Sequence, residues 1–274
     1  MACVKNPEES VNVNANDCSL IVEKPLKMVA GSFYIPKNNG FPNPQGEDSH
    51  FICLEKQTIG VADGVGGWHE KGIDAGEFAR NLMTNTVKAL EKQPKGHIAL
   101  KKVLNEAFIA TNDQGSSTAC ILTLQDDSAR AINVGDSGFM LIRNGTEELY
   151  KSPVQQAYFN CPYQLGKSIN CQNPSVAQMF IQKINSGDVI IAGTDGLFDN
   201  MFLEQIRDLA KEGIKEGKDP TQVAWSIAEH AYYISTDRKA HTPVSKAASM
   251  SGRPCIGGKA DDITVIVAYI TDDI

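Results

Sequence analysis

No part of the sequence is apolar for long. A helix needs roughly 20 consecutive apolar residues to span a bilayer, and no uninterrupted run among the 274 residues approaches that length. Basic residues are also scarce relative to acidic ones, 26 Lys and Arg against 33 Asp and Glu, for a net charge of −7. This balance argues against nonspecific binding to nucleic acid or to an anionic membrane. We therefore expect a soluble protein with neither of these partners.

The sequence also lacks the closely paired cysteines that indicate a zinc site. Its seven cysteines are odd in number and scattered, at Cys3, Cys18, Cys53, Cys120, Cys161, Cys171 and Cys255. Such a pattern is typical of reduced thiols in an intracellular compartment. The five histidines show no metal-ligand spacing either. Nothing in the sequence indicates bound zinc.

Arginine and an apolar signal core are both missing from the first 27 residues, which are polar. A secretory peptide needs the apolar core, and an organellar transit peptide is rich in arginine and poor in acidic residues. Three interpretations stay open: a protein of the cytoplasm or nucleus, a truncated sequence, or a plastid or mitochondrial protein whose leader has been removed. We predict a polar segment over residues 1–25 and one domain over residues 26–274, because 42% apolar content is enough for a substantial core.

Periodicity of apolar residues predicts both helices and strands in this domain. Residues 74–93 and 98–110 repeat apolar positions at helical spacing, and Asp74 with Glu77 resembles a capping box. Three β-prone runs separated by short turns, residues 117–124, 129–134 and 138–143, predict an antiparallel meander. The other expected elements are strands over 26–35, 58–62, 180–184, 188–194 and 263–270, and helices over 203–212 and 220–233.

Short turns between consecutive strands favour mainly antiparallel sheets, with an outer face covered by an amphipathic helix pair. The sequence thus predicts an α+β fold. Residues 37–46 are a loop by their Pro, Gly and Asn content. The tracts 153–178 and 235–258 are expected to form surface loops or a flap, and substrate specificity is expected there.

One acidic residue stands at the end of a β-prone run. Residues 58–62 lead directly into Asp63, which is followed by Gly64, Gly66 and Gly67. This pattern predicts a buried strand that runs into a tight loop with unusual backbone angles. Carboxylate oxygens and a nearby backbone carbonyl are ligands that magnesium, manganese and calcium prefer. The alternative is an ordinary turn in which Asp hydrogen-bonds locally.

Several further acidic residues flank β-prone runs in the same way. Asp136 follows one run, Asp195 follows another, and Asp261-Asp262 precedes a third, while Glu47-Asp48 comes before the Asp63 strand. Carboxylates that converge in a core repel one another and raise each other's pKa unless cations hold them together. The sequence therefore predicts a site for more than one metal ion.

These motifs, in this order, resemble the metal-dependent protein phosphatases of the 2C family over residues 46–268, with the mitochondrial and plastid branch the most similar. The resemblance implies a four-layer αββα fold, in which a sandwich of two mainly antiparallel sheets lies between helix pairs and the metals bind at one edge. It also implies magnesium or manganese as cofactor, two ions with a third, weaker one.

The resemblance further implies a role for each acidic residue. Asp63 would bridge two ions, Gly64 would contribute its carbonyl to one, and Asp195 and Asp261 would complete the other, which makes these three aspartates catalytic. Glu47 and Asp48 would hold metal-bound waters. The remaining implied roles are a third ion site for Asp136 and Asp199, for which ordinary turn-capping is the alternative, and a structural hydrogen-bonding role for Asp262.

The implied activity is hydrolysis of phosphoserine or phosphothreonine in a protein by metal-activated water, by a monomer. Two departures from the family pattern leave other interpretations open: no arginine precedes Glu47 to grip phosphate, and Val65 stands where many relatives have histidine. The alternatives are a non-catalytic regulatory binding module on the same fold and a phosphatase for small molecules.

Overall fold

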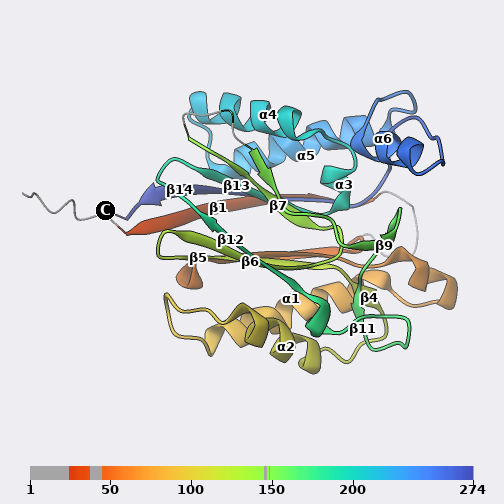
Figure 1. Ribbon diagram of the computed structural model, residues 1–274, viewed down its shortest axis with the longest axis horizontal. Coiled ribbons are helices and arrows are strands. Elements are labelled where there is room, and N and C mark those ends of the chain that lie inside the picture. Colours follow the sequence, from red (N-terminus) through yellow and green to blue (C-terminus); the bar gives the residue numbers. More distant parts are fainter. Residues whose placement is uncertain (1–24, 38–44, 145–146, 148, 274) are drawn as a thin grey trace, which may run out of the picture.

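The computed structural model describes residues 25–37, 45–144, 147 and 149–273. The polar segment expected over residues 1–25 lies, apart from Pro25, outside the described residues, and so does most of the loop expected over 37–46. In the described part, two five-stranded sheets stack face to face and helices cover both outer faces (Figure 1). The predicted α+β fold with four αββα layers is confirmed.

The first sheet contains the first and the last strand of the described chain as neighbours. Its order is β1-β14-β13-β7-β8, and all neighbours are antiparallel. The strands are β1 (Leu26–Ile35), β14 (Ile263–Asp272), β13 (Val189–Gly193), β7 (Gly138–Ile142) and β8 (Leu149–Lys151). Because β14 is flanked on both sides, its side chains are buried from Ile263 to Ala268. This burial on both faces explains its nearly continuous run of β-branched residues.

The second sheet has the order β12-β6-β5-β3-β2, again with all neighbours antiparallel. Its strands are β12 (Gln178–Lys183), β6 (Ser128–Val134), β5 (Ala119–Gln125), β3 (Thr58–Asp63) and β2 (Asp48–Cys53). Short segments beside the sheets are β4 (Ser116–Ser117), β9 (Gln156–Tyr158), β10 (Cys161–Pro162), β11 (Leu165–Gly166), η1 (Leu54–Lys56), η2 (Gly66–Lys71) and η3 (Pro174–Val176).

Helix pairs form the two outer layers. The second sheet is covered by α1 (Ala75–Glu91) and α2 (Leu100–Ala110), and the first by α4 (Leu203–Lys215) and α5 (Pro220–Thr236), as Figure 1 shows. Asp74 caps α1 as predicted, although its carboxylate accepts from the Gly76 N–H rather than that of Glu77. No helix in the described part of the chain has the length and apolar character to cross a membrane.

Three layers of apolar side chains hold the four layers together. One lies between α1, α2 and the second sheet, one between the sheets, and one between the first sheet and α4 and α5. Alternate residues of a strand point to opposite faces, so Ile121 of β5 packs toward α1 and α2 whereas Leu122 packs between the sheets. Each such fully buried side chain contributes about 1.5–3 kcal/mol.

The structure corrects two predictions. The run 138–143 is a strand, β7, but it does not extend the meander, because β5 pairs with β6 whereas β7 joins the other sheet beside β13. The chain crosses between the sheets at Gly135, whose φ of 100° suits glycine. Neither tract expected to be surface loop is all loop: 153–178 contains β9, β10, β11 and η3, and 235–258 contains α6 (Pro243–Met250), capped by Thr242.

Candidate metal centre

The acidic residues singled out from the sequence converge where strands of both sheets end. Carboxylate oxygens of Asp63, Asp136 and Asp195 lie within 4.8 Å of one another, and those of Glu47, Asp261 and Asp262 form a second such group. Asp48 lies directly opposite Asp63 in the antiparallel pair of β2 and β3. Asp199 joins the cluster through a lysine described below. The structure thus brings together all the predicted acidic residues.

Asp63 is the last residue of β3, and Gly64 follows where neighbouring backbone lies close. A Cβ at Gly64 would lie 2.2 Å from the Ala75 carbonyl oxygen and 2.7 Å from that of Glu47. The Gly64 N–H also donates to the Glu47 carbonyl at 3.1 Å. The prediction of unusual backbone angles here was wrong, because none of Gly64, Gly66 and Gly67 has a positive φ. Gly64 is required because neighbouring backbone approaches closely, which keeps its own peptide beside the cluster.

Asp48 is 4% exposed and ties the two sheets together. Its Oδ2 accepts hydrogen bonds from the hydroxyls of Thr194 and Thr264, each at 2.7 Å. Its other oxygen, Oδ1, is buried without a protein partner. Burial is the largest cause that raises the pKa of Asp48 well above its usual range, and repulsion from Asp262 adds to it. A buried carboxylate with one unpaired oxygen favours a cation or ordered water beside it.

Asp195 opens the short helix α3 (Asp195–Phe198), directly after β13, and Asp199 follows its end. The Lys259 ammonium contacts Asp195, and it lies 2.9 Å from Asp199 Oδ2 and 3.3 Å from Asp261 Oδ2. Asn200, fully buried, fixes this lysine by accepting from its backbone N–H and donating to its carbonyl, both at 2.9 Å. One positive charge therefore lies among three of the predicted metal ligands.

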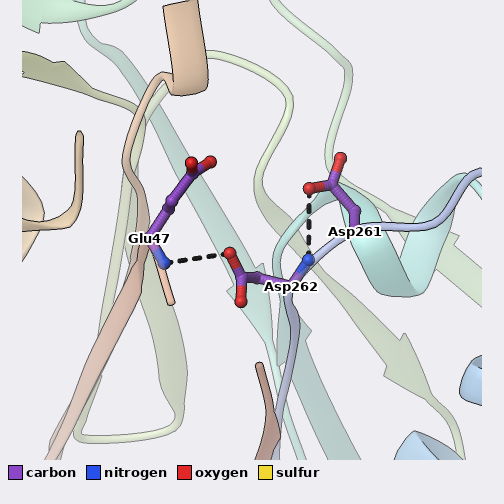
Figure 2. Close-up of side chains that lie close together, drawn as sticks. All are labelled: Glu47, Asp261 and Asp262. Atoms are coloured by element: carbon purple, nitrogen blue, oxygen red, sulfur yellow. Dashed lines mark hydrogen bonds between the residues drawn. The ribbon is translucent and has the colours of Figure 1, made fainter. Parts of the chain in front are cut away.

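The second group lies where β14 begins (Figure 2). Asp262 is 2% exposed, and its Oδ2 accepts from the Glu47 N–H at 2.9 Å. Its Oδ1 accepts from the Tyr34 hydroxyl at 2.8 Å and from the Lys37 N–H at 2.6 Å. Asp262 is thus a structural hydrogen-bonder, as predicted. Asp261 Oδ1 accepts from the Asp262 N–H at 3.1 Å, and the Lys37 ammonium lies 3.4 Å from the same oxygen.

The carboxylates raise one another's pKa. Burial, followed by repulsion from Asp195 and Asp48, raises the pKa of Asp63 well above its usual range. Burial and then Asp195 and Asp199 raise the pKa of Asp136 to about 7, and burial and Asp195 raise that of Asp261. This mutual repulsion is the electrostatic condition that bound cations relieve.

The donor set fits hard divalent cations. It consists of carboxylate oxygens, and one oxygen each of Asp48, Asp136 and Asp195 is buried without a protein partner. Magnesium and manganese prefer such oxygen ligands, whereas zinc prefers histidine and cysteine. The residues present therefore fit the ions that the sequence pattern implies.

Sequence reasoning missed the two lysines beside the cluster. Lys259 and Lys37 contact its carboxylates, and the His69 imidazole, in η2, contacts a Glu47 oxygen. The signal for Lys259 is its position two residues before Asp261. Nothing comparable marks Lys37, because its approach to Asp261 depends on the pairing of β1 with β14.

Relatives of known class support this geometry. No family model matches the chain. "Probable protein phosphatase 2C 55" of Arabidopsis thaliana is 47% identical over 266 residues, which are 96% of this chain and 55% of that protein. "Putative protein phosphatase 2C 24" of Oryza sativa subsp. japonica is 36% identical over 252 residues, 89% of this chain and 77% of that protein. The chain therefore spans little more than half the length of the first relative.

Solved structures share the fold. The photosystem II phosphatase PBCP matches with a TM-score of 0.79 and 32% identity over 88% of this chain and 98% of its own. The catalytic domain of the phosphatase PstP, solved with two manganese ions, matches with a TM-score of 0.63 over 90% of this chain, and its 17% identity bears on the fold alone. The chain therefore shares the fold class of these phosphatases. Within that class, the chain belongs to the protein phosphatase 2C family.

Proposed function

We propose that this chain is a metal-dependent protein serine/threonine phosphatase that hydrolyses phosphoserine and phosphothreonine. The observation that carries the proposal is the cluster of carboxylates from both sheets, with buried oxygens on Asp48, Asp136 and Asp195 that have no protein partner. A non-catalytic module would have no need to keep like-charged groups so close, because each of them raises its neighbours' pKa. Family membership supports the same conclusion.

In this proposal Asp63, Gly64, Asp195 and Asp261 hold two ions, and Glu47 and Asp48 orient waters around them. Asp136 and Asp199 would hold a third, weaker ion. Bound divalent ions supply Lewis-acid chemistry, lowering the pKa of water and offsetting the negative charge of a phosphate monoester. The hydrogen bonds from Thr194 and Thr264 to Asp48 Oδ2 keep that carboxylate from rotating. We propose either magnesium or manganese as the ion.

Basic side chains compensate for the missing arginine and histidine. We propose that the Lys37 ammonium, 3.4 Å from Asp261, binds a phosphate oxygen. His69 Nε2 touches Glu47 at the edge of the cluster and would deliver a proton to the leaving serine oxygen. Neither Lys37 nor His69 has to bind an ion in order to play its proposed part.

The setting of the reaction is also a proposal. We propose one catalytic domain over residues 26–274 that acts as a monomer on phosphorylated proteins, and not on nucleic acid or at a membrane. A plastid location is supported by the 32% identity to a photosystem II phosphatase, and the alternatives are the cytoplasm, the nucleus and the mitochondrion.

The test is hydrolysis of phosphoserine and phosphothreonine peptides by the full chain, first stripped of metal with a chelator and then given magnesium or manganese. Activity that appears only with a restored ion supports the proposal. Activity that survives thorough removal of metal contradicts the metal mechanism. Binding of phosphopeptides without hydrolysis under any ion would favour the regulatory module, and hydrolysis of metabolite phosphates alone would favour a small-molecule phosphatase.

A further inference from the structure

A cavity of about 420 Å³ adjoins the carboxylate cluster. Asp136 and Asp199 belong to both, since each lines the cavity and each lies beside Asp195 or Lys259 in the cluster. The rest of its wall is mainly apolar and includes Val154, Phe159, Phe198, Met201, Phe202 and Val244. Cavities of this size commonly hold a small ligand or a large side chain.

One side of the cavity wall is buried and the other side is more exposed. Met201 and Val244 are 1% and 8% exposed and belong to the packed body of the protein. Val154, on the opposite strand-and-loop segment that contains β9, is 50% exposed although it is a large apolar side chain. Figure 1 shows β9, α3 and α6 at the same end of the molecule. The cavity thus lies between the two tracts, 153–178 and 235–258, in which the sequence leads us to expect specificity.

The charges at the cavity are predominantly negative. Asp136, Asp199 and Glu204 line it together with a single cation, Lys151. The Lys151 ammonium lies 3.9 Å from the centre of the Phe198 ring and donates to the Ser152 carbonyl at 3.2 Å, so it already has partners. An acidic guest would meet Glu204 beside the carboxylates that hold the proposed ion, whereas an apolar guest would remove apolar wall from water.

We propose that this cavity is a substrate subsite that receives a large apolar side chain, aromatic or branched aliphatic, one or two residues from the phosphorylated serine or threonine. The proposal rests on the proposed function, because that function sets the phosphate at the carboxylate cluster. An extended peptide advances 3.3–3.6 Å per residue, so a neighbouring side chain can reach a cavity that begins at Asp136 and Asp199. The subsite selects apolar residues and rejects acidic ones.

The experiment compares phosphoserine peptides in glycine, with Phe, Leu, Asn or Asp placed singly at each of the two positions on either side. The full chain is loaded with manganese, and kcat/KM is measured. N-acetylphosphoserine methylamide, which has no flanking side chain, reports on the reaction itself. Thiophosphorylated versions of the peptides, which are cleaved slowly, give the Kd by fluorescence anisotropy.

Two variants separate the cavity from general effects. Ala247→Phe adds a ring to an exposed position on the cavity wall, and Met250→Phe adds one to the same helix α6 at a residue that is 81% exposed and does not line the cavity. At one position, Phe or Leu should raise kcat/KM about tenfold or more over Asn, the range for an apolar pocket, and Asp should lie below Asn. Ala247→Phe should abolish this gain and Met250→Phe should keep it, with the methylamide cleaved equally by all three proteins.

Equal kcat/KM for apolar and polar neighbours would overturn the subsite, and so would a preference that survives Ala247→Phe. Failure of the wild type to cleave the methylamide and every peptide would instead contradict the proposed function. In that case the Kd series still decides the subsite: an apolar preference removed by Ala247→Phe supports it, and equal Kd values refute it.

Discussion

Lys259→Met should have opposite effects on the metal-free and metal-loaded protein. The Lys259 ammonium contacts Asp195 and lies 2.9 Å from Asp199 and 3.3 Å from Asp261. At about 3 Å and an effective dielectric constant of 20, each unit-charge attraction is about 5 kcal/mol. Desolvation of the ammonium, the largest influence that lowers its pKa, opposes this gain, yet the carboxylates still raise that pKa above its ordinary value. The lysine is therefore charged at neutral pH.

Removing one partner from such a buried network costs about 3–5 kcal/mol, because the remaining charges lose their counter-charge. Methionine keeps most of the volume, so the loss is mainly electrostatic. For a domain of this size, a loss near the lower end lowers the Tm of the metal-free protein by about 6–12 °C. Manganese binding should become tighter by about tenfold or more, since the ion no longer competes with the ammonium for the same carboxylates.

Scanning calorimetry of the chelated protein and titration calorimetry with manganese test both parts. Lys183→Met is the matched control, because Lys183 pairs with Asp127 at 3.6 Å on the surface and is 73% exposed there; it should change the Tm little. If metal-free Lys259→Met melts with the wild type and binds manganese no more tightly, the ammonium does not neutralise the cluster, and the reasoning fails.

Four further predictions concern residues of the cluster and its surroundings. Asp63→Asn should lower kcat by several orders of magnitude with an unchanged circular dichroism spectrum; near-normal turnover would contradict its role as a bridging ligand. Asp262→Asn should cost far less kcat but about 1–3 kcal/mol of unfolding free energy by urea titration, because an amide cannot accept all three of its hydrogen bonds. The pKa of Asp136 is raised to about 7 in the folded protein, so the folded state binds this proton more tightly than the unfolded chain does. The Tm of the chelated protein should therefore fall from about pH 4 to 7, and a Tm that rises over this interval would refute the prediction. His69→Ala should steepen the dependence of rate on leaving-group acidity across substituted phenyl phosphates, because the proposed proton donor is lost; an unchanged slope would mean that the proton has another source, with Val65→His the next variant.

Local patterns predicted those parts of the structure that depend on neighbours in sequence. The strand Leu26–Ile35 and the cap at Asp74 were predicted correctly, because period-two apolar runs and helix-start residues act within a few positions. The acidic residues at strand ends were found for the same reason. Their roles as metal ligands stay a prediction.

What the sequence could not predict depends on contacts between distant segments. The crossing of β7 into the other sheet was missed because a short turn says only that two strands are close, not that they pair. The reason for Gly64 was wrong because the crowding comes from the backbone of Glu47 and Ala75. Lys259 was missed because its three carboxylate partners come from two separate segments.

The position of β14 determines when the carboxylate cluster can first assemble during synthesis. This strand is the last element described, yet it lies between β1 and β13, so the first sheet is incomplete until residue 272 has left the ribosome. The hydrogen bond from the Thr264 hydroxyl to Asp48 joins residues 216 positions apart, and the one from the Tyr34 hydroxyl to Asp262 joins residues 228 positions apart. Neither bond can form before β14 has been made. A nascent chain therefore carries most of the acidic residues of the cluster before Asp261 and Asp262 can join them. The carboxylate cluster is therefore incomplete until β14 has been made, and a ribosome that stalls before β14 releases a chain whose first sheet lacks the strand between β1 and β13.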